Sequence, residues 1–458
     1  MNGHYSDKIY ENIGVNQGGN ASPILFRKYL QDLITYMDRY TGININDETI
    51  IHRLWADDLF FISTNASHAQ IQLNGLSKFC SPNQMLVNNI KTKFMVFGKP
   101  LHVKLKYNDT PIEEVSSYKC LGIVVNKIST FRSDMFKMHP KHLVSQARKC
   151  LFNINRKLSN IGDIPPNYKF FLYTTMAQPI LTYGSELWGS NAKSCELVDK
   201  LFRWYVRWSL RVKSTTSNVI TIGESGLISP STYCHISTIL YAIRLNNLPR
   251  DNILWKLFHE SQRLHEMGFY SWYGKVLALA DSYSIDIKIC NFSDRSKFEI
   301  KSKIKRAFIS KWKEDVQNVQ KFPIVRTYKS FKSKFGISSY LLHVKDSNFR
   351  RALTRLRCSS HTLNIERGRY TVPITPLECR LCTVCKQIED EKHFITECRL
   401  YESERKELFE KIIKIYPSFY SLSSGQKFNF LFKSDEPQIL KWLGKFVHYS
   451  FLIREKSQ

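Results

Sequence analysis

Two adjacent carboxylates, Asp57 and Asp58, stand between two short apolar and aromatic runs, 54–56 and 59–62. Runs of this length and composition are typical of buried β-strands, so we expect the aspartates at the turn of a hairpin. Ionised carboxylates beside a core are costly unless a cation compensates them, and Mg²⁺ favours one or two carboxylates together with water and phosphate oxygens. The ten residues leave two alternatives open: a metal site, or a turn in which aspartate bonds to its own backbone.

A second set of possible metal ligands follows the spacing Cys-x2-Cys-x7-His-x4-Cys, at Cys382, Cys385, His393 and Cys398. Zinc takes four nitrogen or sulfur ligands in a tetrahedron, and a Cys-x2-Cys turn supplies two sulfurs. We expect His393 and Cys398 at the start of a helix that the acidic residues 389–391 open. Cys379 offers an alternative register, Cys379-x2-Cys382, and a set of buried free thiols is a further alternative. The pattern favours a structural zinc site.

A loop rich in glycine and asparagine, 17–20, leads into an apolar segment at Ser22 and Pro23. Serine as the cap and proline in the first turn are typical of a helix start, and we expect the helix to continue to Met37. Glycine lets a backbone approach a ligand closely, and a helix N-terminus offers free N–H groups to a phosphate or a base. By itself such a loop is a weak signal.

Composition indicates a large globular protein that binds a polyanion. The chain has 458 residues, 43% of them hydrophobic, and a formal net charge of +27. A protein this basic usually meets nucleic acid. The apolar runs are short and broken by charged or amide residues, so no membrane span is expected. The N-terminus lacks the apolar core of a signal peptide, and the eleven cysteines are odd in number. We therefore expect reduced thiols in an intracellular protein of the nucleus or cytoplasm.

From about residue 136 the pattern becomes helical. Apolar residues recur at three- and four-residue spacing through Leu143, Ala147, Leu151, Ile154 and Leu158. Residues 298–357 then carry the densest load of lysine and arginine, threaded with aromatic residues. A charge run is usually a solvated face, but one sign dominates over several expected helices here. This favours contact with the backbone of RNA or DNA, without base specificity.

The order of these elements resembles a known family. Gln17-Gly18-x-x-x-Ser22-Pro23-x-Leu25-Phe26, followed by Ala56-Asp57-Asp58, is similar to motifs B and C of reverse transcriptases, more narrowly of the non-LTR (LINE-type) retrotransposon group. Trp55 stands where tyrosine is common. Further landmarks agree in order: 88–97 is similar to motif D, 118–123 to the turn that grips the primer end, 179–189 to the following thumb segment, and 382–398 to the C-terminal zinc knuckle.

The resemblance implies an RNA-directed DNA polymerase that uses two Mg²⁺ ions for nucleotidyl transfer. Asp57 is then the metal ligand proper and Asp58 the second, weaker ligand. The implied partners are an RNA template and a DNA primer or target, with no small-molecule substrate other than the deoxynucleotide and no membrane.

The same resemblance implies substrate contacts outside the aspartate pair. Gln17 and Gly18 would line the incoming nucleotide and the template base. Lys91 or Lys93 could act near the pyrophosphate, and a solvated lysine is the alternative.

The chain also departs from the family pattern. An active polymerase needs another metal-binding aspartate on a strand before the Gln-Gly loop, and only sixteen residues precede Gln17. Asp7 and Glu11 are poor candidates for this ligand because a strand, a connection and a helix would all have to fit between each of them and Gln17. We therefore expect an N-terminally truncated enzyme with little or no activity alone. A non-catalytic nucleic-acid-binding remnant or domesticated protein is the alternative, and a group II intron-like maturase is disfavoured by the zinc knuckle.

The expected fold class is α+β, with a partial reverse-transcriptase palm (an antiparallel sheet with helices), a mostly α-helical thumb and C-terminal region, and a small zinc knuckle. The expected parts are a partial palm at 1–100, primer-grip-like strands at 101–135, a helical thumb and connector at 136–245, a basic helical region at 246–370, the zinc knuckle at 371–400 and C-terminal helices at 401–458.

Overall fold

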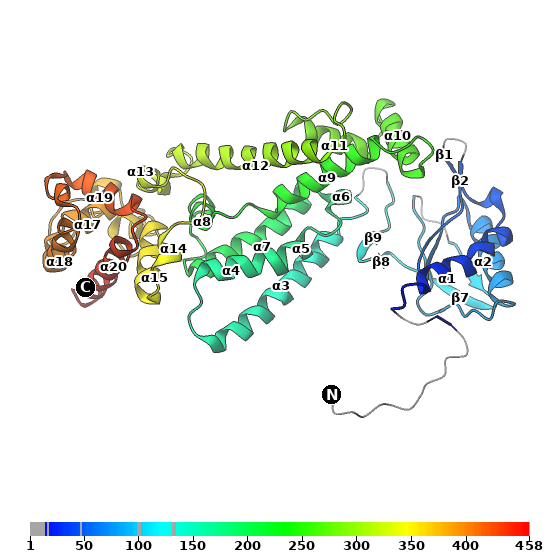
Figure 1. The fold of residues 1–458 in the computed structure, drawn as a ribbon, viewed down its shortest axis with the longest axis horizontal. Helices are drawn as coiled ribbons and strands as arrows, with labels where there is room; N and C mark the ends of the chain where they lie inside the picture. The colour runs from blue at the N-terminus through cyan, green and yellow to red at the C-terminus, as the bar shows by residue number, and fades with distance from the viewer. Residues whose placement is uncertain (1–13, 16–17, 46–47, 99–101, 131–133, 458) are drawn as a thin grey trace, which may run out of the picture. The chain divides into compact units, whose positions relative to one another are not determined.

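A computed structural model describes residues 14–15, 18–45, 48–98, 102–130 and 134–457. The chain divides into two compact units, and each is described by itself. The first comprises Met1–Met135 and Leu248–Ser271, and the second comprises Phe136–Asn247 and Trp272–Gln458. Short strands with helices make up the first unit and helices dominate the second, so the predicted α+β class is confirmed (Figure 1). The finer division into six parts stays a prediction.

The described strands of the first unit form small sheets. Three antiparallel pairs join β1 (Ile43–Ile45) to β2 (Glu48–Ile50), β3 (His52–Trp55) to β4 (Asp58–Phe61), and β8 (Ser117–Cys120) to β9 (Ile123–Asn126). In the remaining sheet, β7 (Thr110–Glu114) pairs antiparallel with β6 (Leu105–Tyr107) and parallel with β5 (Lys93–Phe94). The helices are α1 (Ser22–Tyr29), α2 (Ala66–Cys80) and α10 (Ile253–Glu266).

Helix α2 organises the core of the first unit. Asn65 caps its N-terminus by accepting a hydrogen bond from the His68 N–H at 2.8 Å. Its apolar stripe, including Leu73 and Phe79, is buried against strands β6 and β7. The buried Gln72 amide donates to the Ile62 carbonyl at 3.1 Å, so α2 also holds the chain that leaves β4.

The predicted helix from Ser22 to Met37 is wrong in its start and its length. Ala21 is the N-cap and makes no side-chain cap bond, so Ser22 lies inside the helix as its first residue. Helix α1 ends at Tyr29, and a 3-10 helix follows at Gln31–Tyr36. Packing against α2 overrides the local period, because the tighter winding buries Leu33 (1% exposed).

The hairpin β3–β4 is confirmed as a hairpin, but the prediction that its apolar runs are buried is wrong. Trp55 is 67% exposed and Leu54 37% exposed, whereas Ile51 at the base is buried. At that base the Ile62 N–H donates to the Ile51 carbonyl at 2.9 Å, and Leu59 and Phe61 of β4 pack, partly buried, against the core. A two-stranded ribbon has two faces, and Leu54 and Trp55 of β3 are left exposed.

The second unit is helical. Its first half contains α3 (His139–Leu158), α4 (Pro166–Leu172), α5 (Gln178–Leu181), α6 (Ser185–Trp188), α7 (Ala192–Leu210), α8 (Asn218–Ser225), α9 (Pro230–Asn246), α11 (Trp272–Asp281) and α12 (Asp294–Gln317). Its second half contains α13 (Tyr328–Phe331), α14 (Tyr340–His343), α15 (Ser347–Arg357), α16 (Asn364–Arg367), α17 (Glu391–Thr396), α18 (Glu402–Ile413), α19 (Ser424–Lys433) and α20 (Pro437–Ser457).

The predicted helical periodicity of the second unit is confirmed in α3. Leu143, Ala147, Leu151 and Ile154 are all buried, and α3 packs against α7 (Figure 1). In the second half, α15 packs against α20 around Leu353 and Leu443, both buried. Within the described part of the chain, every helix is too short or too polar to cross a membrane.

Candidate metal centres and nucleic-acid interface

The turn between β3 and β4 presents the two adjacent aspartates. Trp55 pairs with Asp58 across the hairpin, so Ala56 and Asp57 form a two-residue loop and Asp58 begins β4. Ala56 has a φ of 54°, a left-handed conformation that two-residue hairpin loops require and that a non-glycine residue adopts at some cost. The turn therefore holds two consecutive carboxylates at the exposed end of a regular ribbon.

Both carboxylates are available to a ligand. Asp57 and Asp58 are exposed, and neither makes a side-chain hydrogen bond or an ion pair with the residues that the structure describes. The turn between β8 and β9 lies within electrostatic reach, because burial and then the Asp58 charge raise the pKa of the Cys120 thiol. The structure thus brings the aspartate hairpin close to the segment that resembles a primer grip.

The predicted substrate residues are placed unevenly. Gln17, like Asp7 and Glu11, lies outside the described residues. Gly18 is described, with a φ of 87°, and a Cβ added there would meet nothing within 4 Å. The space beside Gly18 is thus open, and its contact with a nucleotide stays a prediction.

The two candidate lysines differ in their surroundings. Lys93 Nζ forms an ion pair with Glu113 Oε2 at 2.6 Å, directly across the parallel register of β5 and β7. Lys91 is exposed in the turn before β5, and its carbonyl accepts a bond from the Tyr118 hydroxyl at 3.4 Å. Lys91 is therefore the more accessible of the two cations. Lys93 links β5 to β7 through its ion pair with Glu113.

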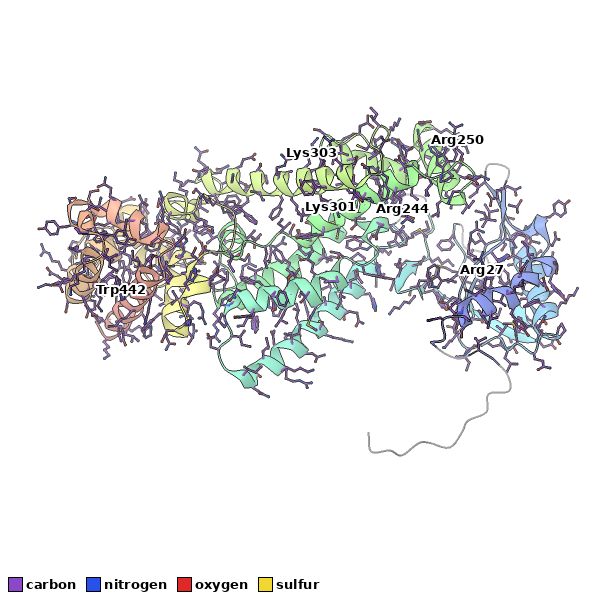
Figure 2. All side chains as sticks on the ribbon, in the orientation of Figure 1. Arg27, Arg244, Arg250, Lys301, Lys303 and Trp442 are labelled. Atoms are coloured by element: carbon purple, nitrogen blue, oxygen red, sulfur yellow. The ribbon has the colours of Figure 1, made fainter. Side chains whose placement is uncertain are left out.

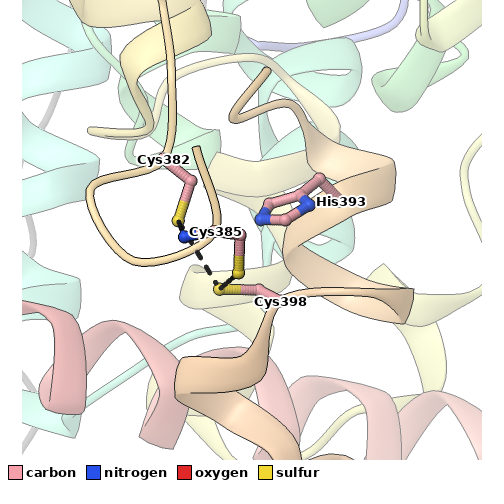
Figure 3. A group of neighbouring side chains, drawn as sticks. All are labelled: Cys382, Cys385, His393 and Cys398. Carbon is pink, nitrogen blue, oxygen red and sulfur yellow. Dashed lines mark hydrogen bonds between the residues drawn. The ribbon is translucent and has the colours of Figure 1, made fainter. Parts of the chain in front are cut away.

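The four predicted zinc ligands come together in the second unit (Figure 3). Their ligand atoms all lie within 4.8 Å of one another. The Cys398 sulfur is 3.8 Å from the sulfur of Cys382 and 3.8 Å from that of Cys385. A tetrahedral zinc with Zn–S bonds of about 2.3 Å requires S···S edges of about 3.8 Å. The distances therefore fit a Cys3His zinc site.

The surroundings of the cluster also fit a metal. Both ring nitrogens of His393 are buried without a hydrogen-bond partner in the described structure. Two backbone N–H groups approach the sulfurs: Cys385 N–H donates to Cys382 Sγ at 3.5 Å, and Arg399 N–H donates to Cys385 Sγ at 3.3 Å. Burial and the neighbouring thiols raise the pKa of Cys398 to about 12, so its thiol is protonated when no metal is bound. Metal binding must then release that proton.

The alternative register through Cys379 is not formed. Cys379 is exposed and lies outside the group of ligand atoms that the described residues bring together. The reason is local: Leu377–Cys379 is a 3-10 turn, and the buried knuckle begins only at Cys382, whose N–H donates to the Gln387 carbonyl at 2.7 Å.

The acidic residues before α17 do more than open the helix. Asp390 caps α17 by accepting from the His393 N–H at 2.8 Å, in line with the expectation that residues 389–391 open this helix. The expectation that Cys398 also lies at the start of the helix is wrong, because α17 ends at Thr396. Glu389 is buried and ion-paired with Arg454 of α20, and Glu391 is buried and paired with Arg326 at 3.0 Å. The sequence interpretation missed this role, although two acidic residues beside Ile388 and Phe394 could have signalled it. These pairs fix the metal knuckle to distant helices.

The basic region 298–357 is only partly a surface. Lys332, Arg350 and Arg357 are buried, and the aromatic residues Trp312 and Tyr328 are buried as well. Packing takes these side chains into the core, so they are not available for the predicted contact with a nucleic-acid backbone. For the rest of the region that contact stays a prediction. The exposed cations that remain are Lys301, Lys303, Arg306, Lys311, Lys313, Lys321, Lys329, Lys334, Lys345, Arg351 and Arg355; Figure 2 marks Lys301 and Lys303 on α12.

Residues 201–208 of α7 also combine aromatic and arginine side chains, and here too some side chains are buried and others are partly exposed. Phe202 and Tyr205 are fully buried, whereas Trp204 and Trp208 are each 37% exposed. Arg203 pairs with Glu196 at 2.5 Å, and Arg207 donates to the Thr216 carbonyl at 2.8 Å. The stripe is therefore mainly a helix core.

Comparison with known proteins agrees with the motif order. Residues 1–125 match the family model described as reverse transcriptase (RNA-dependent DNA polymerase). The chain is 25% identical over 217 residues, 44% of its length, to a retrovirus-related Pol polyprotein from the type-1 retrotransposable element R2 of Popillia japonica. A second polyprotein of that description from the same organism is 27% identical over 220 residues, 47% of the chain. The matches cover 33% and 30% of the two relatives, so the chain spans about a third of their length. The resemblance to non-LTR retrotransposon reverse transcriptases is confirmed.

Proposed function

We propose that this chain, related to the reverse transcriptases of non-LTR retrotransposons, acts as part of an RNA-directed DNA polymerase that uses an RNA template, a DNA primer and deoxynucleotides. One observation carries the proposal: the exposed Asp57–Asp58 pair stands at a hairpin turn inside the segment that matches the family model. Exposed, unpaired, adjacent carboxylates have no role in packing, and they suit a divalent cation with phosphate oxygens.

Mg²⁺ fits this hairpin. Asp57 and Asp58 would hold the ion, and it would supply positive charge to the transferring phosphoryl group. The protein's contribution is the left-handed turn at Ala56, which keeps both carboxylates at the ribbon tip. Among the described residues, these two carboxylates belong to no cluster of three or more metal-binding side chains. We therefore expect little or no polymerase activity from the chain alone.

A structural zinc ion at Cys382, Cys385, His393 and Cys398 is the second part of the proposal. The sulfur distances support it, and so do the two ring nitrogens of His393, which make no hydrogen bond within the described structure. Zinc would supply tetrahedral cross-linking of a short segment that has little core of its own. The buried carboxylates of Glu389 and Glu391 connect that segment to the surrounding helices.

A non-catalytic nucleic-acid-binding protein is the alternative function. The described residues place only two carboxylates, Asp57 and Asp58, at the hairpin turn, but they expose many cations. Lys301, Lys303 and Arg306 lie close in sequence on α12. Contacts of lysine and arginine with phosphates need no catalytic geometry. Binding without catalysis is thus consistent with the same surface.

Two measurements test these functions. In primer extension on an RNA template, Asp57→Ala should abolish any incorporation, whereas Asp109→Ala, at an exposed turn, should leave it unchanged. Both variants should bind a primer–template duplex like the wild type. If the wild type extends no primer, Fe²⁺-dependent backbone cleavage reports metal binding directly: cleavage near 55–60 should occur in the wild type and vanish in Asp57→Ala. Identical cleavage in both proteins would refute the metal site and favour the binding function.

A further inference from the structure

A small pocket in the second unit is lined by an excess of cations. It lies where α4, the C-terminal end of α7 and α15 meet, and it is open to solvent. Its charged lining consists of Lys169, Arg211, Arg350, Arg351 and Asp163. Four positive side chains therefore face one carboxylate.

The single carboxylate is already occupied. Asp163 Oδ1 forms an ion pair with Arg211 Nη2 at 2.7 Å, and its other oxygen accepts from Arg350. The second guanidinium nitrogen of Arg350 donates to the carbonyls of Val344 at 2.7 Å and Lys345 at 3.0 Å. Arg350 is 4% exposed, so it is held rigidly at the pocket wall. Asp163 thus orients two arginines at the pocket wall.

Lys169 holds its ammonium over an aromatic ring and not against a carboxylate. It is only 6% exposed, yet within the described part of the chain its ammonium makes no hydrogen bond and no ion pair. It lies 4.7 Å from the centre of the Trp208 ring. Burial, and then the Arg211 charge, lower the pKa of Lys169. An ammonium on a largely buried side chain, beside two guanidiniums, is stabilised by an anion.

We propose that this pocket binds a phosphate group, with Lys169 and Arg211 as its principal contacts and Arg350 as a fixed positive wall. The inner cations Lys169, Arg211 and Arg350 exceed Asp163 by two charges, which matches a phosphate better than a single carboxylate. Arginine and lysine are the side chains that bind phosphate most strongly, and the Ser347 hydroxyl lines the same space. The phosphate belongs either to a nucleic-acid backbone, in which case the inference rests on the proposed function, or to a free phosphate or nucleotide.

Thermal unfolding of the full chain with inorganic phosphate tests the pocket itself. Phosphate should raise the melting temperature above that in sodium chloride of equal ionic strength. Lys169→Met, which keeps the length of the side chain, should weaken the phosphate affinity at least about tenfold. Lys414→Met, at an exposed position at the end of α18, is the matched control and should retain wild-type affinity. Arg211→Gln, at a half-exposed side chain, repeats the test if Lys169→Met does not fold.

Nucleic-acid binding distinguishes the two sources of phosphate. If the pocket holds a backbone phosphate, Lys169→Met should reduce the salt dependence of binding to an RNA–DNA duplex by about one unit of slope. Loss of phosphate protection with an unchanged slope assigns the pocket to a free phosphate or nucleotide. A third outcome separates the two proposals: the wild type binds no duplex, yet phosphate stabilises it and does not stabilise Lys169→Met. That outcome would refute the proposed function and would support the phosphate pocket. Phosphate protection that is absent in the wild type, or that persists in both Lys169→Met and Arg211→Gln, would overturn the inference.

Discussion

The buried pair between Glu224 and Arg357 provides the most quantitative test of the helical unit. Arg357 Nε donates to Glu224 Oε2 at 3.0 Å and Arg357 Nη2 donates to Oε1 at 3.2 Å, so the pair is bidentate. Both side chains are almost fully buried. The remaining nitrogen of Arg357 donates to the Phe432 carbonyl at 2.9 Å, which joins α8, α15 and α19.

Arg357→Met should lower the free energy of unfolding by about 3 to 5 kcal/mol at pH 7, because it leaves a buried carboxylate without its partner. Lys332 provides partial compensation, since its charge also acts on Glu224. The lost bond to Phe432 adds about 1 kcal/mol. Replacing both partners, as Glu224→Leu with Arg357→Met, should recover part of the loss, because the buried charge is then gone.

The sign of the pH dependence is fixed by Glu224. Burial alone would raise the pKa of this carboxyl, but attraction by Arg357 and Lys332 outweighs burial and holds the pKa below its ordinary value. In the wild type the pair therefore contributes stability above the unfolded pKa of about 4.3, and that contribution is lost as pH falls through the folded value. In Arg357→Met burial prevails and the carboxyl binds a proton more readily. The difference in the free energy of unfolding between the wild type and Arg357→Met should therefore be smaller at pH 5 than at pH 7.

Urea unfolding with hydrogen exchange in 218–225 and 347–357 measures both effects. Arg295→Met is the matched control, because Arg295 and Glu299 form a pair that is 89% and 61% exposed. That control should lose less than about 1 kcal/mol. A loss in Arg357→Met as small as in the control, or a deficit that grows as the pH falls, would refute this account of the pair.

Two further predictions concern the knuckle and the backbone. Cys398→Ser should lower the zinc content of the purified chain from one ion per molecule and make 379–400 sensitive to protease, whereas Cys379→Ser should do neither; unchanged digestion after metal removal would contradict the zinc site. Gly226→Ala should cost more than about 1 kcal/mol in urea unfolding, because Gly226 has a φ of +65° and its added Cβ would meet the backbone of Gly336 and Ile337. Gly425→Ala on α19, where a Cβ meets nothing within 4 Å, is the control and should not destabilise.

Local patterns were the reliable part of the sequence interpretation. The hairpin at Asp57 and Asp58, the helical stripe through Leu143 and Leu151, and the helix start at the acidic residues 389–391 each depend on residues a few positions apart. The helix expected from Ser22 to Met37 was wrong because contacts with α2, some forty residues later, set the winding at Leu33. The exposure of Trp55 could not be predicted from the composition of its strand, because exposure depends on what covers the ribbon.

The sequence by itself determined the order of the motifs, the adjacency of the two aspartates and the spacing of the four zinc-ligand candidates, because covalent spacing sets which side chains one turn can present together. Only the tertiary structure decided which cations face solvent and which lie in the core. Lys301 and Arg357 belong to the same basic stretch, yet one is exposed and the other pairs with Glu224, 133 residues away. That choice depends on long-range packing and the cost of burying charge, which no local pattern encodes.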